Sequence, residues 1–217
     1  MSKLTFDIRL CVSCGLRYPI RRGDSFGKRC PVCLGETSVI SSKVGAEEER
    51  MTEKPLPGKK NHRAVLLDNI RSAWNVGSIL RSADGFGFGH AYLCGITPTP
   101  DPLTSSGRAV LKTSLGAENS VTWSHHKDAV KLAAGLKKEG WKILALEEGG
   151  RDIGRMHFDL PGKSVLVLGS EVAGADPELL TLSDEVLSIP MRGEKRSLNV
   201  AIAFSVAAFA LSSPGLR

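Results

Sequence analysis

Short apolar runs alternate with helical patterns between residues 62 and 211, and this alternation constrains the fold more than any other feature. The strand-like runs are residues 64–67, 91–94, 121–123, 142–146, 164–168 and 186–189. Helical patterns cover residues 75–84, 108–115, 128–138 and 198–211. The run SVLVL at residues 164–168 contains no polar alternation, which is typical of a parallel strand buried on both faces. The pattern therefore predicts an α/β fold with a mostly parallel sheet and helices on both faces.

The closing segment, residues 198–211, is apolar enough to raise the question of a membrane span. It is shorter than the roughly 20 residues that cross a bilayer core, and it carries Asn199 and Ser205. We therefore predict a buried helix and no membrane association. The first residues, MSKLTFDIRL, lack the apolar run and cleavage site of a secretory signal, so a cytoplasmic protein is expected.

A charged segment divides the chain into two parts. Residues 41–61, SSKVGAEEERMTEKPLPGKKN, hold charge blocks, prolines and almost no apolar periodicity, which predicts a linker. The linker would separate a small module, residues 1–40, from a larger domain, residues 62–217. A chain of 217 residues suits one or two domains, at roughly 100–200 residues each.

Four of the five cysteines lie in the small module as two Cys-x-x-Cys pairs, Cys11 with Cys14 and Cys30 with Cys33. This spacing predicts a zinc-ribbon-like module in which four thiolates hold one structural Zn2+ per chain. A module of this size buries too little surface to fold alone, so the metal would supply the missing stability. An iron site with the same ligands, free cysteines or a redox pair are the alternatives. Cys94 ends a predicted strand alone and is expected to be a core thiol.

Positive charge is concentrated in the same module. The formal net charge of the chain is +6, and residues 1–40 contribute +4 of it, from seven Lys or Arg minus three Asp or Glu. Neutralisation of phosphates by Lys and Arg drives nonspecific affinity for nucleic acids. A basic stripe on one small module therefore indicates a nucleic-acid partner.

The first polar motif of the larger domain, Asn75-Val-Gly-Ser-Ile-Leu-Arg81-Ser82, directly follows the first predicted strand. Asn75 and Arg81 lie off a single helical stripe. One of them is therefore expected in the loop at the carboxyl end of the strand, where open α/β sheets bind ligands. A helix cap and a surface arginine are the structural alternative.

The second motif, Gly169-Ser-Glu171-Val-Ala-Gly174, follows the buried strand at residues 164–168. Its glycines would let the backbone approach a ligand closely. Neither this motif nor the Gly-rich stretch at residues 85–89 is a GxGxxG fingerprint after a strand, so a dinucleotide-binding fold is poorly supported.

The third motif joins the last predicted strand to the closing helix. It reads Ile189-Pro-Met191-Arg-Gly193-Glu-Lys-Arg-Ser197-Leu198-Asn199-Val200. Ser197 is predicted to be the N-cap of that helix, since serine accepts hydrogen bonds from the first free backbone N–H groups.

The three motifs, in this order and spacing, resemble the TrmH/SpoU family of the SPOUT RNA methyltransferases. The stretch Lys112-Thr-Ser-Leu-Gly-Ala117 also resembles the connecting segment of that family, and the resemblance covers residues 62–213. The chain departs from the family pattern at Ala73-Trp74, where proline is frequent, and at Ala201, where serine is frequent. The cysteine module replaces the usual RNA-binding extension of the family, which leaves the RNA target open.

The resemblance implies an S-adenosylmethionine (AdoMet)-dependent enzyme that methylates a ribose 2′-hydroxyl of structured RNA, either tRNA or rRNA. It also implies a C-terminal trefoil knot and a homodimer whose active sites draw on both subunits. The matching catalytic positions are Asn75, Arg81, Glu171, Ser197 and Asn199. The positions expected to contact the cofactor are Leu93, Cys94, Gly95, Gly169, Glu171, Gly174, Ile189, Met191, Gly193 and Leu198.

The chemistry of these side chains agrees with that expectation. A methyl group on a sulfonium is already activated, so the enzyme needs to align the hydroxyl and stabilise its developing charge. Arg81 would donate to that oxygen and a nearby phosphate, because a guanidinium keeps its proton in proteins. Asn75, Glu171 and Asn199 would hold loops and substrate, and Ser197 would shape the site. A non-catalytic RNA-binding protein and a base-directed methyltransferase, both with the same superfold, are the alternatives.

Overall fold

The computed structural model describes residues 5–24, 28–44, 62–155 and 162–212, which belong to two compact units, Met1–Gly58 and Lys59–Arg217. The smaller unit contains a three-stranded antiparallel sheet in the order β2-β1-β3. Its strands are β1 (Thr5–Cys11), β2 (Arg17–Arg21) and β3 (Thr37–Val44). The sequence pattern places residues 41–44 in the linker, but they form the end of β3, where they pair with β1. The rest of that predicted linker, residues 45–61, lies outside the described residues.

The larger unit is built on a six-stranded sheet in the order β6-β5-β4-β8-β7-β9. The strands are β4 (Arg63–Asp68), β5 (His90–Cys94), β6 (Thr122–His126), β7 (Lys142–Asp152), β8 (Ser164–Leu168) and β9 (Glu185–Ser188). Every neighbouring pair in this sheet is parallel. The prediction of an α/β fold with a mostly parallel sheet is confirmed.

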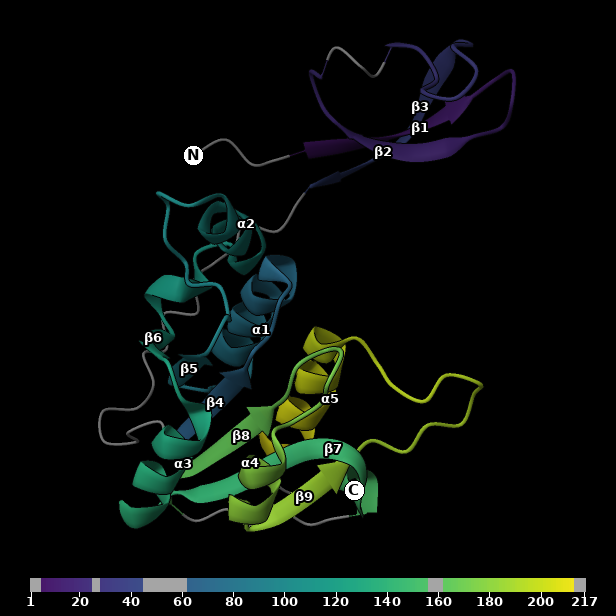
Figure 1. Cartoon of the computed structure of the whole chain (residues 1–217). Coiled ribbons are helices and arrows are strands. Elements are labelled where there is room, and N and C mark those ends of the chain that lie inside the picture. The colour runs from purple at the N-terminus through teal and green to yellow at the C-terminus, as the bar shows by residue number, and fades with distance from the viewer. Residues whose placement is uncertain (1–4, 25–27, 45–61, 156–161, 213–217) are drawn as a thin grey trace. The chain divides into compact units, whose positions relative to one another are not determined.

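Helices cover both faces of this sheet (Figure 1). They are α1 (Ala73–Gly85), α2 (Ser105–Ser114), α3 (Ala129–Lys138), α4 (Pro177–Leu182) and α5 (Val200–Ser212), with short 3-10 turns at Ala117–Asn119 and Ile153–Arg155. Successive residues of β4 show the two layers. Val65 and Leu67 pack in one cluster with α1, α2 and α5, whereas Ala64 and Leu66 pack in another with α3 and α4. The apolar run of a buried parallel strand arises because both of its faces are covered.

The closing helix α5 is only partly buried. Phe204, Ala207 and Ala208 lie in the core between α5, α1 and the sheet. Ile202 and Phe209 remain 54% and 51% exposed on the opposite side of the helix. In the part of the chain that the structure describes, no helix combines the length and the apolar character needed to cross a membrane.

Candidate active site

A cavity of about 1020 Å³ opens beside the middle of β7 and the carboxyl ends of β8 and β9. Loops that follow parallel strands emerge at one edge of a sheet, which is the usual ligand site of open α/β folds. The lining comes from within residues 146–149, 168–174 and 188–200, together with Ala203 of α5. Small-molecule sites typically occupy roughly 300–1,000 Å³, so this cavity is large enough for a nucleoside-sized cofactor.

Most of the residues singled out by sequence lie along the wall of this cavity. They are Gly169, Glu171, Gly174, Ile189, Met191, Gly193, Ser197, Leu198 and Asn199. The second and third motifs are therefore brought together across β8 and β9, which are separated in the sheet by β7.

Leu93, Cys94 and Gly95 are not among the residues that line this cavity, and their contact with the cofactor stays a prediction. They end β5 and begin the next loop, and β4 lies between β5 and β8 in the sheet. Leu93 and Cys94 are fully buried, and burial raises the pKa of the Cys94 thiol to about 12. The expectation that Cys94 is a core thiol is confirmed.

The middle of β7 is a part of the site that the motifs do not reveal. Leu146, Glu147, Glu148 and Gly149 line the cavity. Glu147 Oε1 accepts a hydrogen bond of 2.6 Å from the backbone N–H of Ala175, so it fixes the end of the loop that follows β8. The signal in the sequence is a pair of carboxylates and a pair of glycines directly after a predicted strand.

Gly169 marks the closest backbone approach in the loop after β8. A Cβ atom at this position would lie 2.1 Å from the backbone nitrogen of Ala175. The glycine is therefore required by contact with the chain's own backbone, and it sets how the loop turns beside the cavity. Gly174 has a φ of +75°, in the region that favours glycine.

Glu171 connects the loop after β8 to the start of α1. Its carboxylate accepts hydrogen bonds from the backbone N–H of Arg71 at 3.0 Å and of Ser72 at 3.3 Å. It also accepts a bond of 3.0 Å from Asn75 Nδ2. A carboxylate near a helix N-terminus is stabilised by the free N–H groups and the helix dipole.

These hydrogen bonds decide the charge state of Glu171. Partial burial alone would raise the pKa of this carboxyl, but the bonds from Arg71, Asn75 and Ser72 favour the ionised form. The net effect holds the pKa of Glu171 below its ordinary value. Glu171 is therefore an acceptor at neutral pH and is not suited to donate a proton.

Asn199 extends the same chain of hydrogen bonds to the third motif. Its Nδ2 donates to Asn75 Oδ1 at 3.0 Å, and its Oδ1 accepts from the backbone N–H of Ala201 at 2.9 Å. Asn199 therefore caps α5, which begins at Val200. The prediction that Ser197 is the N-cap is wrong because α5 begins at Val200, which puts Asn199 in the capping position. Ser197 is exposed and lines the cavity.

Arg81 lies apart from this network. Both Asn75 and Arg81 are on α1, so the expectation that one of them lies in the preceding loop is wrong; Ser72 caps the helix. Six residues place the two side chains about 120° apart around the helix axis. Arg81 is exposed and does not line the cavity, and its side chain makes no hydrogen bond to another described residue.

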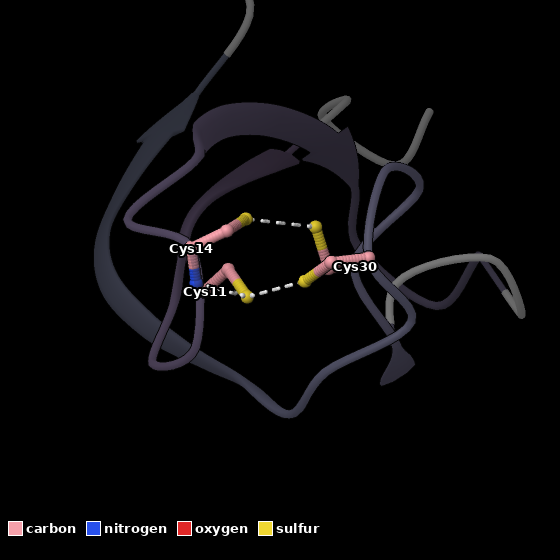
Figure 2. Close-up of side chains that lie close together, drawn as sticks. Cys11, Cys14 and Cys30 are labelled. Atoms are coloured by element: carbon pink, nitrogen blue, oxygen red, sulfur yellow. Dashed lines mark hydrogen bonds between the residues drawn. The ribbon is translucent and has the colours of Figure 1, made fainter.

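The four cysteines of the smaller unit converge as their spacing predicts (Figure 2). Their sulfur atoms all lie within 4.8 Å of one another, with Cys11 to Cys33 at 3.4 Å and Cys14 to Cys30 at 3.6 Å. Sulfurs at about 2.3 Å from a tetrahedral Zn2+ have similar separations, so the cluster fits this ion. The backbone N–H of Cys14 points at the Cys11 sulfur and lowers the pKa of that thiol to about 6.

Comparison with known proteins identifies the larger unit. Residues 62–209 match the model of the SpoU rRNA Methylase family, and the chain belongs to this family. A tRNA (guanosine(18)-2′-O)-methyltransferase of Thermus thermophilus is 31% identical over 162 residues, which are 74% of this chain and 79% of that protein.

Solved structures show the same fold. A TrmH-family structure from Porphyromonas gingivalis is 30% identical with a TM-score of 0.61, and the match covers 69% of this chain and 58% of that one. The SpoU methyltransferase AviRb from Streptomyces viridochromogenes, solved in complex with AdoMet, is 24% identical with a TM-score of 0.62. That match covers 82% of this chain and 68% of AviRb.

Proposed function

We propose that this chain is an AdoMet-dependent methyltransferase that modifies a ribose 2′-hydroxyl of tRNA or rRNA, with residues 62–217 as the methyltransferase domain. The observation that carries the proposal is the hydrogen-bonded chain Glu171–Asn75–Asn199, which ties all three family motifs together beside a cavity of cofactor size. Family membership and the named activity of the Thermus relative support the same reaction.

AdoMet would occupy the cavity between the middle of β7 and the loops after β8 and β9. Leu146, Ile189, Met191 and Leu198 supply apolar surface, and the glycines leave backbone groups accessible to polar atoms of the cofactor. When bound, AdoMet supplies a methyl group on a sulfonium. The protein must hold the acceptor hydroxyl in line with that group.

The network of Glu171, Asn75 and Asn199 would act by positioning. The hydrogen bonds among these three side chains and the nearby backbone fix the two loops and the starts of α1 and α5. Ser197 and Arg81 remain exposed and available to RNA. The five donors of a guanidinium suit a phosphate and an oxygen that develops negative charge.

A second copy of the chain would complete the site. Arg81 lies outside the cavity of its own chain, and α5 exposes Ile202, Val206 and Phe209 beside α1. Apolar side chains on one helix face are typical of a covered interface. We propose a homodimer in which Arg81 of each subunit serves the cavity of the other.

Mixed dimers test this arrangement. At a subsaturating AdoMet concentration, Arg81→Ala and Gly169→Ala homodimers should each lose activity, the first at the substrate side and the second at the cofactor side. If Arg81 acts across the dimer, a heterodimer of the two variants contains one intact site and regains activity. An inactive heterodimer, or a monomer in light scattering at micromolar concentration, would contradict the proposal.

The knot, the metal and the location complete the proposal. After the edge strand β9 the chain returns to place α5 on α1 over the middle of the sheet, which supports a C-terminal trefoil knot. Four clustered thiols support one structural Zn2+ in a zinc-ribbon-like module. Thiolate ligands and an RNA substrate favour the cytoplasm.

The reaction is tested by incubating the purified full chain with methyl-labelled AdoMet and bulk tRNA or rRNA, followed by nucleoside mass spectrometry. We expect the label in 2′-O-methylated nucleosides and little with Arg81→Ala. Label in a base would instead indicate a base methyltransferase. RNA binding without any transfer would indicate a non-catalytic protein.

A further inference from the structure

The smaller unit separates its charged side chains between the two faces of its sheet. Residues directly opposite each other in an antiparallel sheet share a face, and alternate residues of a strand point to opposite faces. The register places Phe6 opposite Arg21 and Lys43, and Leu10 opposite Arg17. We call this side of the sheet the basic face; its members are Phe6, Ile8, Leu10, Arg17, Pro19, Arg21, Ser38, Ser41 and Lys43.

The cations on the opposite face are already engaged. Arg22 forms an ion pair of 2.8 Å with Asp7 and donates to Ser42. Arg9 donates through Nε to Thr37 Oγ1 at 2.8 Å and through a second nitrogen to the backbone carbonyl of Thr37. These arginines therefore stabilise the sheet itself and offer less to a partner.

The cations of the basic face are free by comparison. Arg17, Arg21 and Lys43 are exposed, and none of their side chains makes a hydrogen bond or ion pair to another described residue. No acidic residue occupies a position on this face. Phe6, Ile8 and Leu10 lie between them on the central strand and are partly exposed.

The dimensions of the basic face suit a nucleic-acid strand. Arg17 and Arg21 are four residues apart on β2, or about 13 Å at 3.3 Å per residue. Lys43 lies across the central strand, about 10 Å from β2 at roughly 4.8 Å per strand. Cations at this spacing can contact separate phosphates, while an aromatic and an aliphatic strip between them can contact bases and riboses.

We propose that the basic face binds a phosphate-rich strand of the RNA that the larger unit methylates, an inference that rests on the proposed function for the identity of the RNA. Charge complementarity selects this occupant because three unpaired cations surround an apolar strip with no acidic group. The basic face would bind the RNA substrate and set the affinity of the protein for it, while methyl transfer takes place at the cavity of the larger unit.

The test compares the metal-loaded full chain with two triple variants of equal net charge. The first is Arg17→Gln, Arg21→Gln and Lys43→Gln, which empties the basic face. The second is Lys127→Gln, Lys131→Gln and Lys138→Gln, which removes three exposed charges on and near α3. Metal content and calorimetric AdoMet affinity should equal those of the unmodified chain in both variants.

RNA affinity should fall only in the first variant. A plot of log affinity against log salt has a negative slope, and each lost phosphate contact reduces the magnitude of that slope by about 0.7. The loss of three contacts should therefore reduce it by about 2. The affinity lost between 50 and 200 mM salt should then be roughly 20-fold smaller than in the unmodified chain. In steady-state assays, KM for RNA should rise while kcat stays close to its original value.

Three outcomes would overturn the proposal: equal RNA affinity in both triple variants, a loss in kcat alone, or a change confined to binding of phosphatidylserine vesicles. The result is separable from the proposed reaction. If the unmodified chain binds RNA through this face but transfers no methyl group, the RNA-binding proposal holds and the proposed reaction is refuted. If the unmodified chain methylates RNA and the first variant does so with unchanged KM, the proposed reaction holds and the RNA-binding proposal is refuted.

Discussion

The interiors of the two units of this protein are built differently. In the described part of the smaller unit, residues 5–24 and 28–44, the only buried side chains are Cys11 and Cys30. The larger unit has two apolar clusters, one on each face of its sheet. Several apolar residues of the smaller unit remain exposed, among them Val12 and Val32 at 72% and 74%. The comparison shows that the cysteine cluster stands where an apolar core would be in the described part of one unit, while the other unit has a close-packed core on each face of its sheet.

The largest expected effect on this comparison is the unfolding of the smaller unit in the Cys30→Ser variant treated with a chelator. Loss of one thiolate should unfold the smaller unit, because binding of structural zinc contributes about 10–16 kcal/mol in small zinc domains. The larger unit should keep its calorimetric AdoMet affinity. Cys94→Ala is the matched control, since it alters a buried thiol of the larger unit and should leave one metal per chain. Well under one metal ion per unmodified chain would refute the metal assignment.

The second effect concerns chemistry within the larger unit. Arg81→Ala should lower single-turnover methyl transfer about 100- to 1,000-fold, or roughly 3–4 kcal/mol, as expected for one preorganised donor. Calorimetric AdoMet affinity should change little, because Arg81 does not line the cavity. Weak cofactor binding with near-normal turnover at saturation would reverse this assignment.

A third, smaller effect is expected from Gly169→Ala. The added Cβ would meet the backbone of Ala175 at 2.1 Å, so the loop must shift at a cost of about 1–3 kcal/mol. AdoMet affinity should fall more than the rate at saturating cofactor. Gly135→Ala on α3 is the control, since a Cβ there meets nothing within 4 Å. The control should stabilise the helix by about 0.5–1 kcal/mol. Equal AdoMet affinity in both variants would show that loop shape does not govern cofactor binding.

The smallest effect is the pH dependence of Glu171→Gln. Because the pKa of Glu171 is lowered in the folded state, its contribution to unfolding free energy is complete above the ordinary value of 4.5. The contribution is lost as pH falls through the lowered folded pKa. Glu171 is an exposed residue and its carboxylate is only partly buried, so the difference at neutral pH should be below about 1 kcal/mol. Denaturant unfolding of both proteins between pH 3 and 7 measures it, and a difference that grows on acidification would contradict the assignment.

The sequence by itself determined the features that depend on neighbouring residues. Alternating strand and helix patterns are local, and they predicted every strand of the larger unit within a few residues, although β7 runs on to Asp152 and α4 was missed. A six-residue helix is too short to show a recognisable helical spacing of apolar residues. The Cys-x-x-Cys pairs also predicted the cluster, because two residues between cysteines turn both sulfurs toward one point.

Only the tertiary structure decided which of these pieces meet. The bonds from Asn75 to Glu171 and to Asn199 join residues 96 and 124 positions apart. Strand order places β4 between β5 and β8, so Leu93–Gly95 do not line the cavity, whereas β7 brings Leu146–Gly149 into its wall. The register of strand pairing in the smaller sheet likewise places the cations without side-chain partners on one face and the paired arginines on the other. Such contacts depend on how strands pair across the whole chain, and local periodicity contains no information on that pairing.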